Sequence, residues 1–187
     1  NNLPTETTPD VGINAVFKST NDGQTWTDIT TGKVDHDPRF TFDNIPTDLA
    51  VSPFSPDTLY AAFGFLRSNG IWKTVNGGLT WTKLTNGLPS PIPGSTGYNR
   101  IELAMAPSNS SVLYASFSDS ASNESLGIWK TVNAGNSWTK VTTPLSTAPR
   151  NISDGRTTVL GEQGFYNNAL RVHPTDPNTV FAGGIDI

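Results

Sequence analysis

The chain has no cysteine among its 187 residues, and this absence removes disulfides, thiolate catalysis and cysteine-based metal sites together. Charged residues are also scarce, at 15%, and the formal net charge is -4. This acidic balance argues against nucleic acid or an anionic membrane surface as the main partner. No apolar run approaches the roughly 20 residues of a membrane-spanning helix, so no membrane span is expected.

What the chain does contain is one motif written three times, which holds all five tryptophans. Each copy opens with an aromatic residue and a lysine, continues with Ser or Thr, Asn and Gly at alternate positions, and closes with Trp. The copies are Phe17–Trp26, Trp72–Trp81 and Trp129–Trp138, so the closing tryptophans lie 55 and 57 residues apart. A period of this length indicates a repeat architecture.

A second pattern recurs out of phase with the first, at 49–60, 103–114 and 170–181. In each copy two short apolar runs flank a turn rich in Pro, Ser, Asp and Asn, and an aromatic residue falls seven positions after the first proline. Such a pattern predicts a β-hairpin. The tryptophan motif is itself two short runs around an Asn/Gly turn, so each repeat has four strands.

Four short antiparallel strands in every repeat predict an all-β fold made of β-propeller blades. In the first full blade the strands are expected at 48–53, 58–63, 70–75 and 80–85. The boundaries predict a half-blade at 13–30, full blades at 48–85 and 101–142, and a second half-blade at 169–187. Residues 1–12 are expected to form an extended N-terminal segment.

Two full blades and two complementary halves amount to three blades, whereas closed propellers typically take about four to eight. An open stack would leave unpaired strand edges. Two explanations stay open at this point. The chain is part of a longer protein that completes the ring, or several copies combine, the half-blade of one completing the half-blade of another.

The turn of the tryptophan motif, which we call the box, has a structural logic. An Asn side chain can bond to backbone amides of the turn, the Gly two residues later supplies a positive φ, and the Ser or Thr adds a hydroxyl bond. The closing Trp is expected to cover the hairpin. Chemistry would rarely need the same groups in every blade, so we interpret the box as structural. Its residues are Ser19, Asn21, Gly23, Trp26, Thr74, Asn76, Gly78, Trp81, Thr131, Asn133, Gly135 and Trp138.

The boxes resemble the Asp-box, or bacterial neuraminidase repeat, and the resemblance covers about residues 13–187. Proteins with this repeat include sialidases, xyloglucanases, sortilin-type receptors and large secreted bacterial proteins. The resemblance implies a propeller with its boxes at the outer edge of one face, and ligands on the opposite face or in the channel mouth. All three boxes here carry Asn where the family usually has Asp, which keeps the acceptor oxygen but removes the charge. A cation site at the box is therefore not expected.

The ligand-binding face would be formed by the loops that enter each first strand and each third strand. The longest such loop spans 143–168, and long loops on rigid scaffolds often carry function. A short cluster at 35–39 alternates acids and imidazole but lacks the further ligands of a metal site, so no metal or cofactor is expected. His173 is interpreted as a turn residue. The ligand-binding candidates are Asp35, His36, Asp37, Arg39, Tyr98, Arg100, Arg150, Asp154, Arg156, Glu162 and Tyr166.

Asp48 and Glu102 are the catalytic candidates, because they occupy the same place at the head of the first strand in adjacent blades. Paired carboxylates can hydrolyse a glycosidic bond when they are roughly 5 to 10 Å apart. Acids repeated at a strand start can also bond backbone amides or stay solvated. Both interpretations of the pair stay open at this point.

The sequence therefore favours a non-catalytic, secreted or cell-surface propeller module that binds carbohydrate or protein, or acts as a scaffold, as part of a larger protein. A glycoside hydrolase fragment of sialidase or xyloglucanase type is the alternative, although the Arg-Ile-Pro tripeptide common in sialidases is absent. A sortilin-type receptor that binds peptides in its channel is a second alternative. The extracellular location rests on the Thr- and Asn-rich composition and on the resemblance.

Overall fold

The protein's structure is a computed structural model that describes residues 14–34, 45–65, 70–90, 97–121, 123, 125–141, 164, 166 and 168–183. All regular structure in these residues is β-strand, and every strand pair is antiparallel. The segment expected at 1–12 lies outside the described residues. The strands are β1 Phe17–Lys18, β2 Thr27–Asp28, β3 Ile45–Val51, β4 Leu59–Gly64, β5 Gly70–Thr74, β6 Thr82–Leu84, β7 Tyr98–Ala106, β8 Asn109–Asp119, β9 Ser125–Thr131, β10 Thr139–Lys140, β11 Ala169–Val172 and β12 Val180–Gly183.

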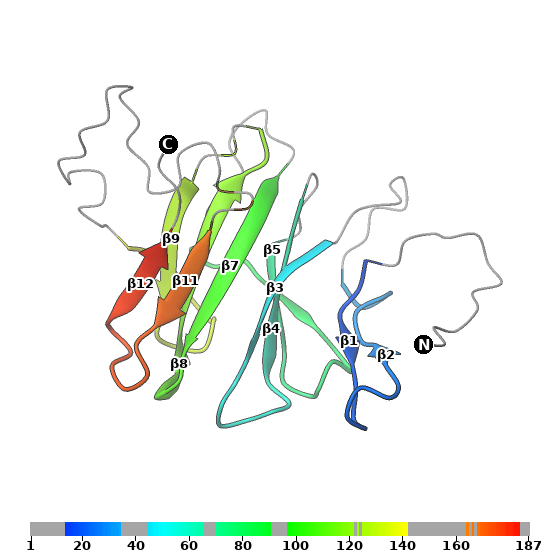
Figure 1. Ribbon diagram of the computed structural model, residues 1–187. Coiled ribbons are helices and arrows are strands. Elements are labelled where there is room, and N and C mark those ends of the chain that lie inside the picture. The colour runs from blue at the N-terminus through cyan, green and yellow to red at the C-terminus, as the bar shows by residue number, and fades with distance from the viewer. Residues whose placement is uncertain are drawn as a thin grey trace.

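These strands form four sheets that follow one another along the chain. Strands β3 to β6 make one four-stranded sheet in sequence order, β7 to β10 make another, and β1–β2 and β11–β12 are two-stranded. The sheets stand beside one another like an opened fan, with β3, β7 and β11 toward the middle of the view (Figure 1). The predicted fold is confirmed as a partial β-propeller of two full blades and two half-blades.

In the first full blade, two strands start two or more residues away from the expected positions. Strand β3 begins at Ile45 rather than at 48, because Ile45 and Pro46 continue the ladder opposite Gly64 and Phe63 of β4. Strand β6 begins at Thr82 rather than at 80, because the amide of Thr80 is held by the box turn. Asp48 therefore lies inside its strand and not at the strand's head.

Among the described residues, the hydrophobic core is divided into three layers, each between two neighbouring blades. Alternate residues of a strand face opposite sides of its sheet, so one blade supplies side chains to two layers. Each layer buries large apolar side chains, whose removal from water stabilises by roughly 1.5–3 kcal/mol apiece. The buried members are Val16, Ile29, Val34, Ala61, Phe63, Trp72 and Trp81 in the first layer; Ala50, Tyr60, Ala62, Ile71, Tyr98, Ile101, Leu103, Leu113, Ala115, Phe117, Trp129 and Trp138 in the second; and Ala104, Ala106, Val112, Tyr114, Leu170 and Val172 in the third.

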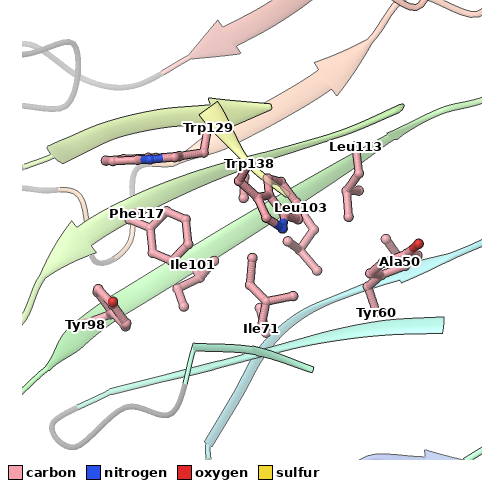
Figure 2. Close-up of a cluster of buried hydrophobic side chains, with 12 residues drawn as sticks. Ala50, Tyr60, Ile71, Tyr98, Ile101, Leu103, Leu113, Phe117, Trp129 and Trp138 are labelled. Carbon is pink, nitrogen blue, oxygen red and sulfur yellow. The ribbon is translucent and has the colours of Figure 1, made fainter. Parts of the chain in front are cut away.

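The second layer, between the two full blades, is rich in aromatic rings (Figure 2). The ring of Phe117 meets Tyr98 edge to face at 5.1 Å between centroids and Trp129 at 5.3 Å. Edge-to-face pairs add about 0.5–1.5 kcal/mol beyond burial. Blade stacking, rather than a single central core, therefore holds the molecule together.

Each box turn is closed by the same set of side-chain hydrogen bonds. In the middle box, Asn76 Oδ1 accepts from the Thr80 amide and from the Thr74 hydroxyl, both at 2.9 Å, and Asn76 Nδ2 donates to Thr80 Oγ1 at 2.8 Å. The Gly78 amide donates to Thr74 Oγ1 at 3.0 Å, and Gly78 has φ +92°. The equivalent bonds recur around Asn21 and Asn133.

The closing tryptophan of a box was expected to cover its own hairpin, but Trp81 packs against the preceding half-blade instead. Trp81 Nε1 donates to the Ile29 carbonyl at 2.8 Å, in the preceding half-blade, and its ring is buried in the first layer. Its role is thus to join one blade to the blade before it. Trp26 Nε1 instead donates to Gly23 O of its own box at 3.1 Å.

Candidate functional site: the inner strands

The first strands of three successive sheets, β3, β7 and β11, lie side by side (Figure 1). We call these three the inner strands. Their sequences align at the apolar positions Leu49, Leu103 and Leu170. One residue before each of these stands Asp48, Glu102 or Ala169. The two catalytic candidates are therefore brought onto neighbouring inner strands, within the strands rather than at their heads.

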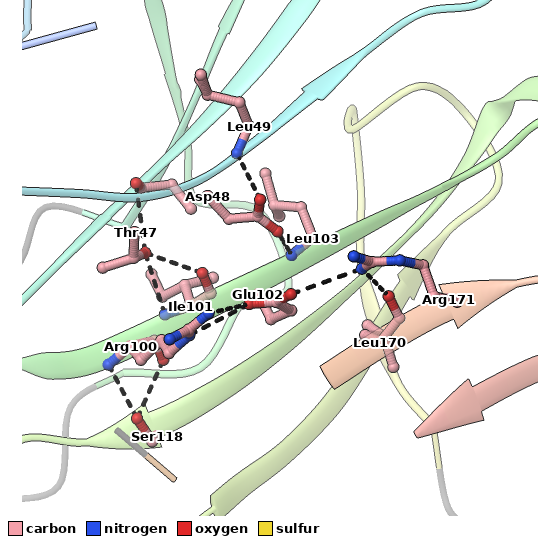
Figure 3. A network of polar contacts seen from close by, with 11 residues as sticks. Thr47, Asp48, Leu49, Arg100, Ile101, Glu102, Leu103, Ser118, Leu170 and Arg171 are labelled. Atoms are coloured by element: carbon pink, nitrogen blue, oxygen red, sulfur yellow. Dashed lines mark hydrogen bonds and ion pairs between the residues drawn. The ribbon is translucent and has the colours of Figure 1, made fainter. Parts of the chain in front are cut away.

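Asp48 is tied to the next blade through the backbone (Figure 3). Its Oδ2 accepts from the Leu103 amide of β7 at 2.7 Å, and its Oδ1 accepts from the Leu49 amide at 2.8 Å. The neighbouring Thr47 hydroxyl donates to the Ile101 carbonyl at 2.9 Å and accepts from the Ile101 amide at 3.3 Å. Both residues fasten β3 to β7.

Glu102 is held by two arginines, one from its own strand and one from the next blade (Figure 3). Its Oε2 accepts from Arg100 Nη2 at 2.9 Å and from Arg100 Nε at 3.2 Å. Its Oε1 lies 3.6 Å from Nη1 of Arg171 on β11. The Glu102 side chain is only 8% exposed, and a buried carboxylate of this kind requires charged or hydrogen-bonding partners.

Burial raises the pKa of Glu102, and the negative charge of Asp48 acts in the same direction. The hydrogen bond and positive charge of Arg100, with the charge of Arg171, act against this rise in pKa. The net direction is upward, so desolvation outweighs the two guanidinium groups.

This arrangement fits the joining of blades better than two-carboxylate hydrolysis. Hydrolysis needs one carboxyl to deliver a proton to the leaving group and the other to attack the sugar or activate water. Here both oxygens of Asp48 accept backbone amides, and both oxygens of Glu102 face guanidinium groups. The geometry makes both acids ties between adjacent inner strands.

Arg171 is the member of this site that sequence reasoning did not single out. It stands where the equivalent positions of the other inner strands carry Ala50 and Ala104. That departure from an otherwise small-residue position was the available signal. Its side chain is largely exposed, and its Nη1 also donates to the Leu170 carbonyl at 2.6 Å.

The remaining described candidates differ in how much of their surface solvent can reach. Tyr98 is buried against Phe117, its hydroxyl donates to the Pro89 carbonyl, and burial raises its pKa to about 12. Its ring is therefore part of the core and not a surface for stacking on a ligand. Arg100 is committed to Glu102 but partly exposed, and Tyr166 exposes half of its side-chain surface.

The other ligand-binding candidates lie outside the described residues. His173 is described, and its Nδ1 accepts from the amides of Thr175 and Asp176, both at 3.3 Å, in the turn between β11 and β12. In the described part of the chain, no three His, Cys, Asp or Glu side chains are grouped so that they could hold a metal ion. The same residues contain no helix long and apolar enough to cross a membrane. The candidates beyond the described residues are Asp35, His36, Asp37, Arg39, Arg150, Asp154, Arg156 and Glu162.

Comparison with known proteins finds similarity at the level of the fold. No protein-family model matches the chain, and no curated protein matches it by sequence. An ancestral GH74 enzyme is similar in structure, with a TM-score of 0.54 and 16% identity, over 87% of this chain and 18% of that one. A GH74 enzyme of Niastella koreensis has a TM-score of 0.38 and 18% identity, over 89% of this chain and 32% of that one. The GH74 xyloglucanase from Xanthomonas campestris has a TM-score of 0.36 and 12% identity, over 90% and 32%.

GH74 enzymes are β-propeller glycoside hydrolases, so the similarity to the ancestral enzyme supports the β-propeller fold for this chain. The chain spans about a fifth of that enzyme's length and about a third of the other two. At 16% identity the likeness is one of fold.

Proposed function

We propose that the chain is a non-catalytic segment of a secreted Asp-box β-propeller that binds a carbohydrate or protein ligand at its inner-strand face. The commitment of Asp48 and Glu102 to the neighbouring blade carries this proposal. These two carboxylates already bind groups that hold neighbouring inner strands together. In this proposal the inner strands therefore supply rigidity and charge but no acid–base pair. The proposed location outside the cell rests on the Thr- and Asn-rich composition and on the Asp-box resemblance.

The binding surface would lie where the inner strands meet the loops that enter them. Arg100 and Arg171 present guanidinium groups there on two adjacent inner strands. A guanidinium group has five N–H donors, which suit the hydroxyl and carboxylate oxygens of sugars and of acidic peptides. Tyr166 offers an exposed ring in the loop that precedes β11. Arg171 thus joins Arg100 and Tyr166, which the sequence already offered, and all three have exposed surface that a ligand could reach.

A glycoside hydrolase is the second candidate, and the fold similarity to an ancestral GH74 enzyme is the observation that favours it. In that case the catalytic acids would come from residues other than the pair on β3 and β7. The ligand would still be a polysaccharide, and the inner strands β3, β7 and β11 would serve to position it.

Hydrolysis and binding assays on the same chain separate the two candidates. A panel of sialosides, xyloglucan and β-glucans is incubated with the chain and with Asp48→Asn and Glu102→Gln, and released sugar is measured. We expect no turnover by any of the three proteins. Turnover by the unaltered chain that both variants lose would contradict the non-catalytic proposal.

Binding is tested by calorimetric titration with soluble glycans and acidic peptides. Arg171→Ala should lower the affinity for the ligand that binds by about tenfold or more, as expected for loss of a charged hydrogen bond. Lys140→Ala removes one positive charge from β10, away from the inner strands, and serves as the matched control. Equal losses in both variants would mean that the ligand senses net charge and not this surface.

A further inference from the structure

The turn that follows β6 joins the two full blades through its main chain and one side chain. Asn86 Nδ2 donates to the Asn136 carbonyl at 3.0 Å, and the Asn86 carbonyl accepts from the Trp138 amide at 3.0 Å. An added Cβ at Gly87 would clash with the Trp138 carbonyl oxygen, so this position requires glycine. The turn thus packs closely against the box of the second full blade, although Asn86 and Gly87 themselves are exposed.

Asn86 and Gly87 form an Asn–Gly dipeptide, a sequence prone to spontaneous loss of the asparagine amide group. The main-chain nitrogen of the glycine attacks the side-chain carbonyl carbon of the asparagine, and glycine permits this approach because it has no Cβ. A new C–N bond forms, the bond from that carbon to Nδ2 breaks, and ammonia leaves a cyclic succinimide. Water then opens the ring to aspartate or isoaspartate, so water is the only other reactant.

The chain contains three such dipeptides, at 69–70, 76–77 and 86–87. Asn69 lies outside the described residues. The other two dipeptides have the same chemistry and differ in how the structure holds them. Asn76 therefore serves as an internal reference for Asn86.

At Asn76 the box occupies both of the groups that would react. Asn76 Oδ1 accepts two hydrogen bonds and Nδ2 donates one, all within the box turn. The attacking nitrogen is occupied as well, because the Gly77 amide donates to the Asp57 carbonyl at 2.9 Å. Reaction at Asn76 therefore requires the loss of three side-chain hydrogen bonds and one main-chain hydrogen bond.

At Asn86 much less holds the reacting groups. Among the described residues its side chain makes one hydrogen bond, to Asn136, and the Gly87 amide has no partner. Gly87 lies at φ +78° in an exposed turn that the Leu88 amide closes by donating to the Thr85 carbonyl. The two sites thus differ by three hydrogen bonds, which corresponds to about tenfold or more in rate.

We propose that Asn86 is a site of spontaneous covalent modification, and that its conversion to aspartate or isoaspartate weakens the contact between the two full blades. The product lacks the Nδ2 donor, so a carboxylate oxygen faces the Asn136 carbonyl with no hydrogen between the two acceptors. In isoaspartate, the carbonyl that accepts from Trp138 also leaves the main chain and becomes part of the carboxylate. The modification is independent of ligand binding at the inner strands.

Peptide mapping of the folded chain during incubation at mildly alkaline pH tests the site. Cleavage after Lys73, Lys83 and Arg100 places Asn76 and Asn86 in separate peptides. The Asn86 peptide should gain about 1 Da, and do so roughly tenfold or more faster than the Asn76 peptide. In concentrated urea, which removes the folded structure, the two rates should agree. Equal rates in the folded chain, or faster reaction at Asn76, would overturn the proposal.

A matched variant tests the consequence for the blade contact. Asn86→Gln keeps the amide group but adds one methylene, which disfavours ring closure, so the mass gain at this position should disappear. The urea midpoint of the unaltered chain should fall during incubation in step with the modified fraction, whereas that of Asn86→Gln should stay constant. Asn86→Asp should show the lowered midpoint from the start. A midpoint that stays constant while Asn86 is converted would contradict the proposed weakening.

Discussion

The full blades and the half-blades of this protein carry the same box but treat its tryptophan differently. In the box at Asn76 and in the box at Asn21, the turn is closed by the same hydrogen bonds with nearly equal lengths. Trp81 nevertheless bonds to the preceding blade, whereas Trp26 bonds within its own box and stays exposed. The turn is thus a local property of eight residues, and the burial of its tryptophan is a property of the stack.

The largest test of this difference is removal of the two tryptophans one at a time. Trp81→Ala should lower the free energy of unfolding by about 3–5 kcal/mol, because it leaves a cavity between blades and an unpaired Ile29 carbonyl. Trp26→Ala should lower it by less than about 1 kcal/mol, as for most surface substitutions. Urea unfolding of the two variants and of the unaltered chain measures both losses. Equal losses would show that the tryptophan acts within its own hairpin.

Glycine substitutions in the box should show a smaller difference of the same kind. Gly78 and Gly23 both have positive φ, +92° and +80°, so alanine strains either backbone by a similar amount. Only at Gly78 does the new methyl also meet Ile29 of the neighbouring blade, at 2.7 Å. Gly78→Ala should therefore cost about 1–3 kcal/mol more than Gly23→Ala, from overpacking. Thermal unfolding of both variants gives the comparison, and equal costs would exclude a contribution from blade contact.

Replacing the asparagine of the box should have the same effect in a full blade as in a half-blade, because its hydrogen bonds lie within one turn. Asn76→Ala and Asn21→Ala each remove three side-chain hydrogen bonds within one turn, worth about 0.5–1.5 kcal/mol apiece. Hydrogen exchange of the Thr80 and Thr25 amides should accelerate to a similar degree in the two variants. Asn76→Asp keeps the acceptor oxygen and is the control, with protection of Thr80 retained.

The smallest effect expected is a pH dependence at Glu102. Its folded pKa lies above the value of 4.5 for a free carboxyl, so between these two values the folded state binds more protons than the unfolded state. Stability contributed by this group is therefore complete below pH 4.5 and is lost as pH rises through the folded pKa. Glu102→Gln should lack this loss and gain on the unaltered chain as pH rises.

Unfolding curves at a series of pH values measure the difference between the two proteins, at most about 1.4 kcal/mol for each pH unit that separates the pKa values. Asp22→Asn removes one acidic charge from an exposed turn and controls for net charge. An opposite slope for Glu102→Gln would mean that the arginines outweigh burial in setting the pKa.

The blades were predictable from the sequence because a hairpin is coded by nearby residues. The aromatic seven positions after Pro53 or Pro107 and the fixed box register are enough to count strands and to place their ends within about three residues. The exact start of β3 was not predictable, since Ile45 and Pro46 become strand only by pairing with β4. The place of Asp48 within its strand follows from that pairing.

The candidate site was predictable only in part. The equivalent positions of Asp48 and Glu102 in the repeat placed them on neighbouring inner strands. The same equivalence does not predict which groups their side chains bind. Asp48 meets a backbone amide, whereas Glu102, with one more methylene, meets two arginines. Arg171 joins the site from a residue 69 positions away, a distance over which no local pattern carries information.

The sequence by itself determined the four-stranded repeat, the box turn and its Asn, Gly and hydroxyl bonds. The box bonds join residues at most four positions apart, and each strand of a repeat pairs with the strand next to it in the chain. The tertiary structure decided which tryptophans are buried and which carboxyl group forms ion pairs with arginine. Those outcomes depend on a neighbouring blade being in place, which buries Trp81 whereas Trp26 stays exposed. Burial is also the largest cause that raises the pKa of Glu102.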